Sequence, residues 1–339
     1  MSVTIKDVAN EAGVSISTVS KIINGKGSIS QDTINRVQET IRRLNYTPNS
    51  RAVSFAKQNT KNIIFLTSMK KNEPYLNPHM FEIMDGSYSA LSGLDYTLSL
   101  MDISMKDGQE SPVIQAIQSG CADGILVHGS AVTEETAKYI IDSNFPHVII
   151  GSPSMDNQLC WIDTNHVLAG QCAAEHLLEC GYMNIVFIGE KRTDFISNQR
   201  LKGVKKAFIN HGLHLAAENI YSISSNISNA RSLTKEILTD NPKIQAIICE
   251  NNTIAFGVSA GILDLKLDVP NDIAFITFDS YPYANIIEPK PTVVDIDMFD
   301  LGFQAAQTLI RKIDNPLLLA QGYSTLPILK QGLTTKKGL

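Results

Sequence analysis

The chain has 339 residues, of which 43% are hydrophobic and 19% are charged, and its formal net charge is -5. The length suits two compact units, and the composition excludes a disordered chain, a collagen-like repeat and a coiled coil. No apolar run approaches the roughly 18–20 residues that cross a bilayer, and the N-terminus lacks the layout of a secretory signal. We therefore predict a globular, cytoplasmic protein that makes no contact with a membrane.

The cysteines and histidines do not form a recognisable site. None of the five cysteines belongs to a CxxC pair, and the seven histidines show no HExxH spacing, so the sequence predicts reduced thiols, no metal and no cofactor. The nucleotide-binding motifs of common enzymes are also missing, since no GxGxxG follows a strand and GxxxxGK[ST] does not occur. We predict that the protein is not an enzyme.

The charges are distributed unevenly along the chain. Residues 1–61 carry nine lysines and arginines against four acidic residues, whereas the remainder carries 20 against 30. A basic segment on an acidic body is typical of a nucleic-acid-binding head, because cations near phosphates release condensed counterions. A solvated basic face would produce the same imbalance, so charge alone leaves both interpretations open.

Three short helices are predicted in residues 1–47. Thr4 can cap the first, which ends at Gly13; Ser15 can cap the second, and the third follows Ser30. Their apolar residues recur with the 3.6-residue period of a helix, which predicts a small three-helix core. The arrangement is a helix-turn-helix unit.

In such a unit, the second helix enters the major groove of DNA with its N-terminal residues against base edges. Ile16, Ser17 and Lys21 are then the candidates for base contact, through a thymine methyl group, a hydroxyl hydrogen bond and guanine acceptors, respectively. Two amphipathic helices around a glycine also occur in many proteins that never bind DNA, so the spacing alone does not decide the function.

Two segments resemble the opening of LacI/GalR (lactose-repressor) family regulators: TIKDVANEAGVSISTVSKIIN from Thr4 to Asn24, and LNYTPN from Leu44 to Asn49. The resemblance implies a homodimer on double-stranded operator DNA. It also implies a hinge helix within residues 48–61, whose Phe55 would wedge into the minor groove. The DNA-binding residues predicted in this way are Thr4, Ser15, Ile16, Ser17, Thr18, Ser20, Lys21, Asn24, Asn49 and Phe55.

Residues 62–339 alternate short apolar runs with helical patterns. The runs are 63–66, 96–100, 124–127, 147–150, 185–188, 246–248 and 273–278, and helix candidates include 81–92, 167–180 and 199–211. This alternation predicts parallel sheets covered on both faces, with ligands beyond the carboxyl ends of the strands. The resemblance continues here and implies a two-lobed α/β effector domain of the periplasmic-binding-protein-like (type I) class. The chain would cross between its lobes near residues 160–164, 290–294 and 322–326.

The resemblance also implies effector-binding residues in the cleft between the lobes: His79, Met80, Trp161, Asn165, Asp194, Arg200, Asn252 and Asp279. Arg200 would grip effector oxygens with Asp279 as its acidic partner across the cleft, or the two would form a salt bridge between the lobes. His79 and Asn165 could instead be hydrogen-bonded parts of the cleft wall. Trp161, the only tryptophan, could cover a sugar face or simply pack in a core.

The sequence thus predicts three segments: the helix-turn-helix at 1–47, a hinge helix and linker at 48–61, and an effector-binding and dimerisation domain at 62–339. The predicted function is a ligand-responsive repressor of a carbohydrate-utilisation operon. It would bind a palindromic operator as a homodimer, with a sugar or sugar phosphate as effector. One alternative is the same regulator controlled by a phosphoprotein or a non-sugar metabolite, and a more distant one is a sugar-binding protein that does not bind DNA.

Overall fold

The computed structural model describes residues 3–23, 29–46, 60–69, 79–104, 110–153, 158–190, 194–280, 283–319 and 321–336. The chain divides into two compact units, residues 1–61 and 62–339. Three predicted DNA-binding residues, Asn24, Asn49 and Phe55, lie outside the described residues, as does most of the predicted hinge segment. In the part of the chain that is described, no helix has the length and hydropathy that a membrane span requires.

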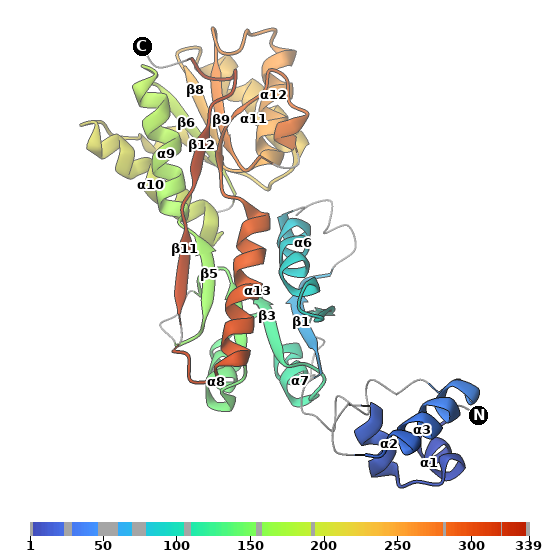
Figure 1. Cartoon of the computed structure of the whole chain (residues 1–339). Coiled ribbons are helices and arrows are strands. Elements are labelled where there is room, and N and C mark those ends of the chain that lie inside the picture. Colours follow the sequence, from blue (N-terminus) through green and yellow to red (C-terminus); the bar gives the residue numbers. More distant parts are fainter. Residues whose placement is uncertain are drawn as a thin grey trace. The chain divides into compact units, whose positions relative to one another are not determined.

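The described residues of the first unit form three helices (Figure 1), which enclose a small apolar core. The helices are α1 (Ile5–Ala12), α2 (Ile16–Ile23) and α3 (Gln31–Arg43). Thr4 caps α1, and Gly13 ends it with a φ of 64°, a left-handed conformation that glycine adopts without steric cost. One valine from each helix, Val8, Val19 and Val37, is fully buried. The predicted helix-turn-helix is confirmed.

The described part of the second unit contains two six-stranded sheets, ordered β11-β5-β4-β3-β1-β2 and β12-β10-β9-β8-β6-β7. We call the part around the first sheet the first lobe, and the part around the other the second lobe. The first lobe contains β1 (Asn62–Thr67), α6 (His79–Ser92), β2 (Thr97–Asp102), α7 (Pro112–Gln118), β3 (Gly124–His128), α8 (Glu134–Ser143), β4 (His147–Ile150), β5 (Trp161–Thr164), α13 (Met298–Asp314) and β11 (Gly322–Thr325). The second lobe contains α9 (His166–Glu179), β6 (Ile185–Gly189), α10 (Phe195–Asn210), β7 (Ile220–Ser222), α11 (Ile227–Asp240), β8 (Ala246–Cys249), α12 (Asn252–Asp264), β9 (Ala274–Phe278), β10 (Thr292–Asp295) and β12 (Ile328–Lys330).

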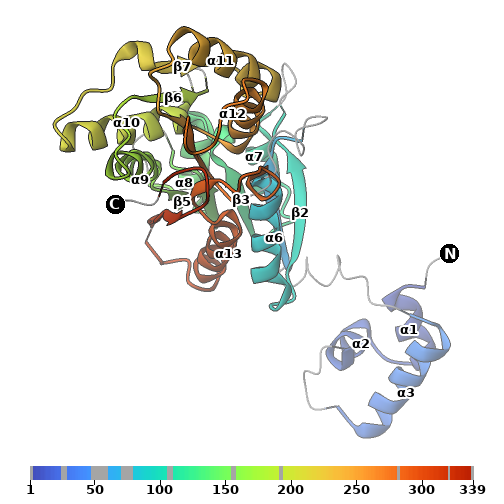
Figure 2. The same ribbon diagram turned by 90° about the horizontal axis from the view of Figure 1, so that it is seen from above.

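Helices cover both faces of each sheet (Figure 2). In the first lobe, Ile63 and Phe65 of β1 face α6 and α13, whereas Ile64 and Leu66 face α7 and α8. In the second lobe, α9 and α10 pack on one face of the sheet, and α11 and α12 pack on the other. Strands buried on both sides have nearly continuous apolar sequences. Described strand pairs are parallel except β10 with β12, which confirms the predicted α/β fold.

The described residues cross between the lobes three times, at or just after the predicted positions. The predicted windows fall on the strands β5, β10 and β11 themselves, and the crossings follow at residues 165, 296–297 and 326–327. The reason is that β5 and β11 still pair with each other up to Thr164 and Thr325. Sheet pairing therefore extends to the last residue before the chain leaves the first lobe at these two crossings.

Glycines let neighbouring helices touch backbone to backbone. A Cβ atom on Gly203 of α10 would lie 1.9 Å from a carbonyl oxygen of α9, and one on Gly170 of α9 would lie 1.9 Å from a carbonyl oxygen of α10. In the first lobe, Gly86 of α6 and Gly302 of α13 form an equivalent pair, each 2.0 Å from a carbonyl oxygen of the other helix. These glycine pairs fix how close α9 lies to α10 and α6 to α13.

Candidate functional site

The start of α2 presents the residues that the sequence assigns to base contact. Ser15 caps the helix, because its Oγ accepts a hydrogen bond from the backbone N–H of Thr18 at 3.1 Å. Ile16 is 47% exposed, and Ser17 and Lys21 are also exposed. One apolar, one hydroxyl and one cationic side chain are therefore available to a partner in the first two turns of this helix. Their contact with DNA bases stays a prediction.

The other described residues that were predicted to bind DNA in the first unit either make hydrogen bonds at the start of a helix or are less exposed than Ile16, Ser17 and Lys21. Thr4 Oγ1 donates to Asp7 Oδ2 at 2.7 Å and accepts from the Asp7 N–H at 3.4 Å. The hydrogen bonds that the Thr4 hydroxyl and the Thr4 backbone N–H donate to the Asp7 carboxylate hold its pKa below the ordinary value. Thr18 and Ser20 are half-buried, and the Thr18 hydroxyl lies 2.8 Å from the Ser15 hydroxyl. Thr4 and Thr18 thus stabilise helix starts, whether or not they contact phosphate.

A cavity of about 370 Å³, which we call the cleft cavity, is lined by both lobes of the second unit. Many of its polar residues follow the carboxyl ends of parallel strands, the usual ligand position in such folds. Residues that line it include His79, Met80, Asp163, His166, Glu190, Asp194, Arg200, Glu250, Asn252 and Asp279.

Arg200 is at the centre of the polar wall of the cleft cavity and is only 3% exposed. Its guanidinium lies 4.3 Å from the centroid of the Phe278 ring. Nη1 donates to the backbone carbonyl of Glu250 at 2.5 Å and lies 3.4 Å from Glu250 Oε1, and Nη2 lies 3.8 Å from Asp279 Oδ2. All these residues belong to the second lobe. The prediction that Arg200 and Asp279 face each other across the cleft is therefore wrong, since α10 and the end of β9 are in the same lobe.

Two histidines pair with carboxylates in the same cavity. His79 Nε2, at the start of α6, lies 3.4 Å from Asp279 Oδ2, and this contact joins the first lobe to the second. His166 Nε2, at the start of α9, lies 3.3 Å from Asp163 Oδ1. No group of three or more histidine, cysteine or acidic side chains among the described residues is arranged to hold a metal ion.

Some buried side-chain polar atoms have no hydrogen-bond partner in the described part of the chain. They are His79 Nδ1, His166 Nδ1, Arg200 Nε and Asp279 Oδ1. All of these residues line the cleft cavity. Because a buried unpaired polar group costs on the order of 1–3 kcal/mol, their concentration here indicates a place prepared for a polar ligand.

Burial also changes the acidity of the cavity wall. Burial is the main cause that raises the pKa of the Glu250 carboxyl to about 7, and repulsion from Asp194, Glu190 and Asp279 raises it as well. The positive charge of Arg200 acts in the opposite direction. Burial would likewise raise the pKa of Asp163, but hydrogen bonds from His166 and from backbone N–H groups lower it below the ordinary value. The cavity thus holds one acid that titrates near neutral pH and one that stays ionised.

Replacing Glu250 by glutamine should flatten the pH dependence of stability. In the folded protein the carboxyl keeps its proton up to about pH 7, whereas the unfolded chain releases it near the ordinary value of 4.5. This group therefore favours the folded state at acidic pH, and its contribution is lost as the pH rises toward 7. We expect Glu250→Gln to remove on the order of 2–3 kcal/mol of this decline, measured by urea unfolding between pH 5 and pH 8. Parallel pH profiles of the two proteins would contradict the raised pKa.

Asp194 and Asn252 line the cleft cavity, as predicted, but their side chains also hold the structure together. Asp194 caps α10 by accepting a backbone N–H at 2.8 Å. Asn252 Nδ2 donates to the carbonyl oxygens of Phe278 and Asp279 at 3.0 and 2.9 Å, and its Oδ1 accepts from the Ala284 N–H at 2.9 Å. Asn252 thus fixes the backbone that carries Asp279.

Trp161 and Asn165 are not in the cleft cavity. Both line a neighbouring cavity of about 280 Å³, which we call the hinge cavity because β5 and β11 leave the first lobe there. Asn165 Oδ1 accepts from the Leu168 N–H at 2.9 Å and so caps α9. Trp161 is partly buried against the core of the first lobe. The structure therefore places these two predicted effector residues beside the cleft cavity.

His166, Glu190 and Glu250 also line the cleft cavity, although none of them was predicted as a site residue. Glu190 directly follows β6, Glu250 directly follows β8, and His166 comes after the end of β5. The signal was present, because a polar residue directly after a buried parallel strand lies at the ligand-binding edge of the sheet. The predicted site residues followed the motifs of the family resemblance instead, and these three residues were not among them.

The comparisons with known proteins agree with this architecture. Residues 4–49 match the model of "Bacterial regulatory proteins, lacI family", and residues 174–335 match that of a "Periplasmic binding protein-like domain". The HTH-type transcriptional regulator RegA of Clostridium saccharobutylicum is 27% identical over 95% of this chain and 96% of its own length. Catabolite control protein A of Priestia megaterium is 28% identical over 92% of each chain.

A solved structure of the Lac repressor dimer bound to operator and the anti-inducer ONPF has the same fold. Its TM-score is 0.82, with 20% sequence identity over 99% of each chain. The two family models together match more than half of the residues, and the relatives align over almost the whole length. The chain belongs to the LacI family of bacterial regulatory proteins.

Proposed function

We propose that this protein is a ligand-responsive transcriptional repressor of a carbohydrate-utilisation operon. It binds a palindromic operator as a homodimer and takes a sugar or sugar phosphate as effector in the cleft cavity. The observation that carries the effector part is the set of buried, unpartnered polar atoms gathered there. The regulator acts in the cytoplasm and by binding alone, without catalysis.

The chemistry of the cavity suits a polyhydroxylated ligand. Arg200 Nε can only donate a hydrogen bond, Asp279 Oδ1 can accept one, and each histidine Nδ1 can do either according to its protonation. A sugar hydroxyl both donates and accepts, so one ring can satisfy all three kinds of group. The volume of about 370 Å³ is at the lower end of the range for small-molecule sites, which suits a ligand the size of one sugar ring.

The proposed coupling between effector and operator follows from the position of the cavity. His79 Nε2 in the first lobe and Asp279 Oδ2 in the second are 3.4 Å apart, so a ligand that contacts both residues bears on the spacing of the lobes. Any ligand that changes operator affinity must itself bind with an affinity that depends on the operator, because the two equilibria are linked. A homodimer is part of the proposal because one small headpiece buries too little surface for tight, specific binding.

The test combines two measurements on the full-length protein. Thermal unfolding with a panel of sugars and sugar phosphates should reveal at least one that raises the melting temperature. Titration of DNA from the protein's own promoter region, with and without that compound, should then show a change in affinity. No stabilisation by any compound of the panel would contradict a sugar effector, and no binding to any promoter DNA at low salt would contradict the regulator.

Replacing Lys21 by alanine should relax sequence preference at one operator position. Lys21 is exposed on α2, near the capped start of the helix that would enter the major groove. Loss of a base contact costs roughly 1–3 kcal/mol at the base that is read and much less at other bases. Competition binding with single-base operator variants measures this difference. Equal weakening on every sequence would mean that Lys21 contacts phosphate instead.

A further inference from the structure

The hinge cavity, next to the cleft cavity, is lined by aromatic and polar residues of the kinds found in ligand-binding sites. It has a volume of about 280 Å³, and its lining includes Trp161, Phe195, Gln199 and Ser324. It shares Asp163 and His166 with the cleft cavity, so the two cavities border the same pair of side chains. The proposed effector contacts of the cleft cavity do not account for these aromatic and polar groups.

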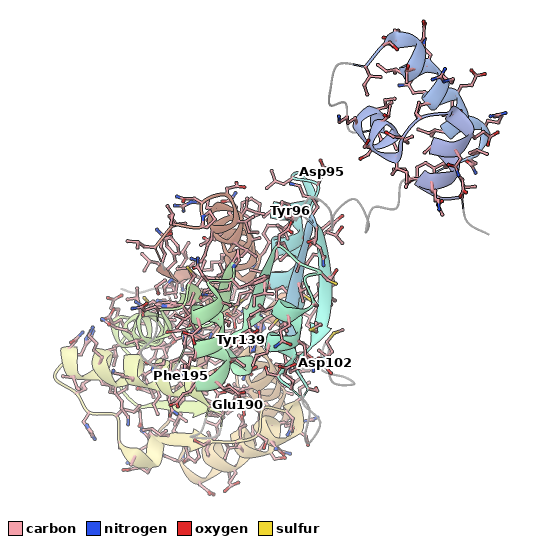
Figure 3. The ribbon with its side chains drawn as sticks, turned by 90° about the horizontal axis from the view of Figure 1, so that it is seen from below. Asp95, Tyr96, Asp102, Tyr139, Glu190 and Phe195 are labelled. Atoms are coloured by element: carbon pink, nitrogen blue, oxygen red, sulfur yellow. The ribbon has the colours of Figure 1, made fainter. Side chains whose placement is uncertain are left out.

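Two aromatic side chains border the hinge cavity. Phe195, the first residue of α10, is 42% exposed and is labelled in Figure 3. The Trp161 indole lies against Gly322, its partner on β11, and a Cβ atom at that position would be 2.5 Å from the indole Cε2. The missing side chain at residue 322 therefore makes room for the indole beside the cavity.

Polar groups accompany these rings. Gln199 and Ser324 line the hinge cavity, and Ser324 is exposed. His166, which is only 4% exposed, has an unpartnered Nδ1 and borders both cavities. Aromatic faces combined with a few amide, hydroxyl and imidazole groups form a surface that suits a pyranose ring, which has an apolar face and a polar edge.

We propose that the hinge cavity binds a sugar ring, packed against Trp161 and Phe195, next to the effector in the cleft cavity. The inference extends the proposed function, because it adds a second ring site to a sugar-responsive regulator. The ring has two possible sources, either the second unit of a disaccharide whose first unit is in the cleft cavity or a separate monosaccharide. Both sources present the same chemistry to the hinge cavity, and they differ in stoichiometry.

The test uses the single tryptophan of the chain as its probe. Full-length protein is titrated with glucose, galactose, maltose, cellobiose and lactose, while tryptophan emission, melting temperature and calorimetric stoichiometry are recorded. A ring on the indole excludes water and so shifts its emission. In one outcome, a disaccharide binds once per chain and shifts the emission, whereas its monosaccharide raises the melting temperature without shifting the emission. The ring in the hinge cavity is then the second unit of the disaccharide. A monosaccharide that binds twice per chain, with the shift in one step, identifies a separate ring.

Variants test whether the cavity itself is responsible. Phe195→Ala should weaken the binding step that shifts emission by about tenfold, and Phe299→Ala, with a phenylalanine of similar exposure (40%) outside both cavities, should not. Gly322→Ala should displace the indole and abolish the shift, while stabilisation through the cleft cavity persists. If sugars stabilise the protein without any change in Trp161 emission, or if neither cavity variant alters the response, the hinge cavity is not a sugar site. If no sugar of the panel binds at all, the sugar effector of the proposed function fails as well.

Discussion

Arg200→Ala should abolish the effect of a bound sugar on operator affinity, while operator binding without sugar remains. Arg200 supplies the cationic part of the polar wall, and its Nε is an unpartnered donor in the cleft cavity. Loss of a buried, charged hydrogen-bond partner costs about 2–5 kcal/mol, so we expect sugar affinity to fall by about thirtyfold or more. The exposed start of α2 belongs to the other compact unit and is not altered by this substitution.

The experiment needs a control, because removing Arg200 leaves Glu250 without its cation. The melting temperature should therefore fall, and operator titrations should be made well below it. Arg231→Ala is a matched control, since Arg231 is an arginine of the second lobe that pairs with Asp264 outside both cavities and is half exposed. A normal sugar response in Arg200→Ala, or an equal loss in Arg231→Ala, would place the effector elsewhere.

Gly203→Ala should strongly destabilise the second lobe. A Cβ atom at this position would overlap a backbone carbonyl oxygen of α9 at 1.9 Å, and a backbone cannot move aside as a flexible side chain can. The helices α9 and α10 would have to separate, and their shared core with β6 and β9 would loosen. We expect a loss of roughly 2–3 kcal/mol of unfolding free energy, measured by denaturant titration.

Gly93→Ala is the matched control for this substitution. Gly93 has no atom within 4 Å of the added Cβ and no left-handed backbone, so alanine should be accepted there with little change in stability. Similar unfolding midpoints for Gly203→Ala and the wild type would show that α9 and α10 can move apart freely.

The sequence predicted most of the central strands but missed several short ones, among them β5 and β10, which lie inside the two sheets. The apolar runs at 63–66, 185–188 and 273–278 became β1, β6 and β9 because strands buried on both faces need apolar side chains at every position. The strands β7 and β11 have only three or four residues, and their side chains are half-buried or exposed. Such edge strands depend on pairing with a neighbour, which the periodicity of a short segment does not reveal.

Part of the candidate site could also be predicted from the sequence. Arg200 and Asp279 could be assigned through the family resemblance, and the structure places both in the cleft cavity. That they share one lobe could not be read from the sequence, because it depends on which sheet each strand joins. The Arg200–Glu250 contact, between residues 50 positions apart, likewise arises only when α10 packs beside the end of β8.

The paired glycines of the second unit also make its helix pairs rigid. Each side of the cleft cavity rests on a helix, α6 with His79 and α10 with Arg200, and each of these helices is in direct backbone contact with its neighbour. Such contacts leave little soft side-chain packing to absorb a displacement. A ligand that displaces either wall would therefore move a pair of helices as one rigid body. The conformational change would then be concentrated in the few connecting residues at 165, 296–297 and 326–327, which would act as the hinge.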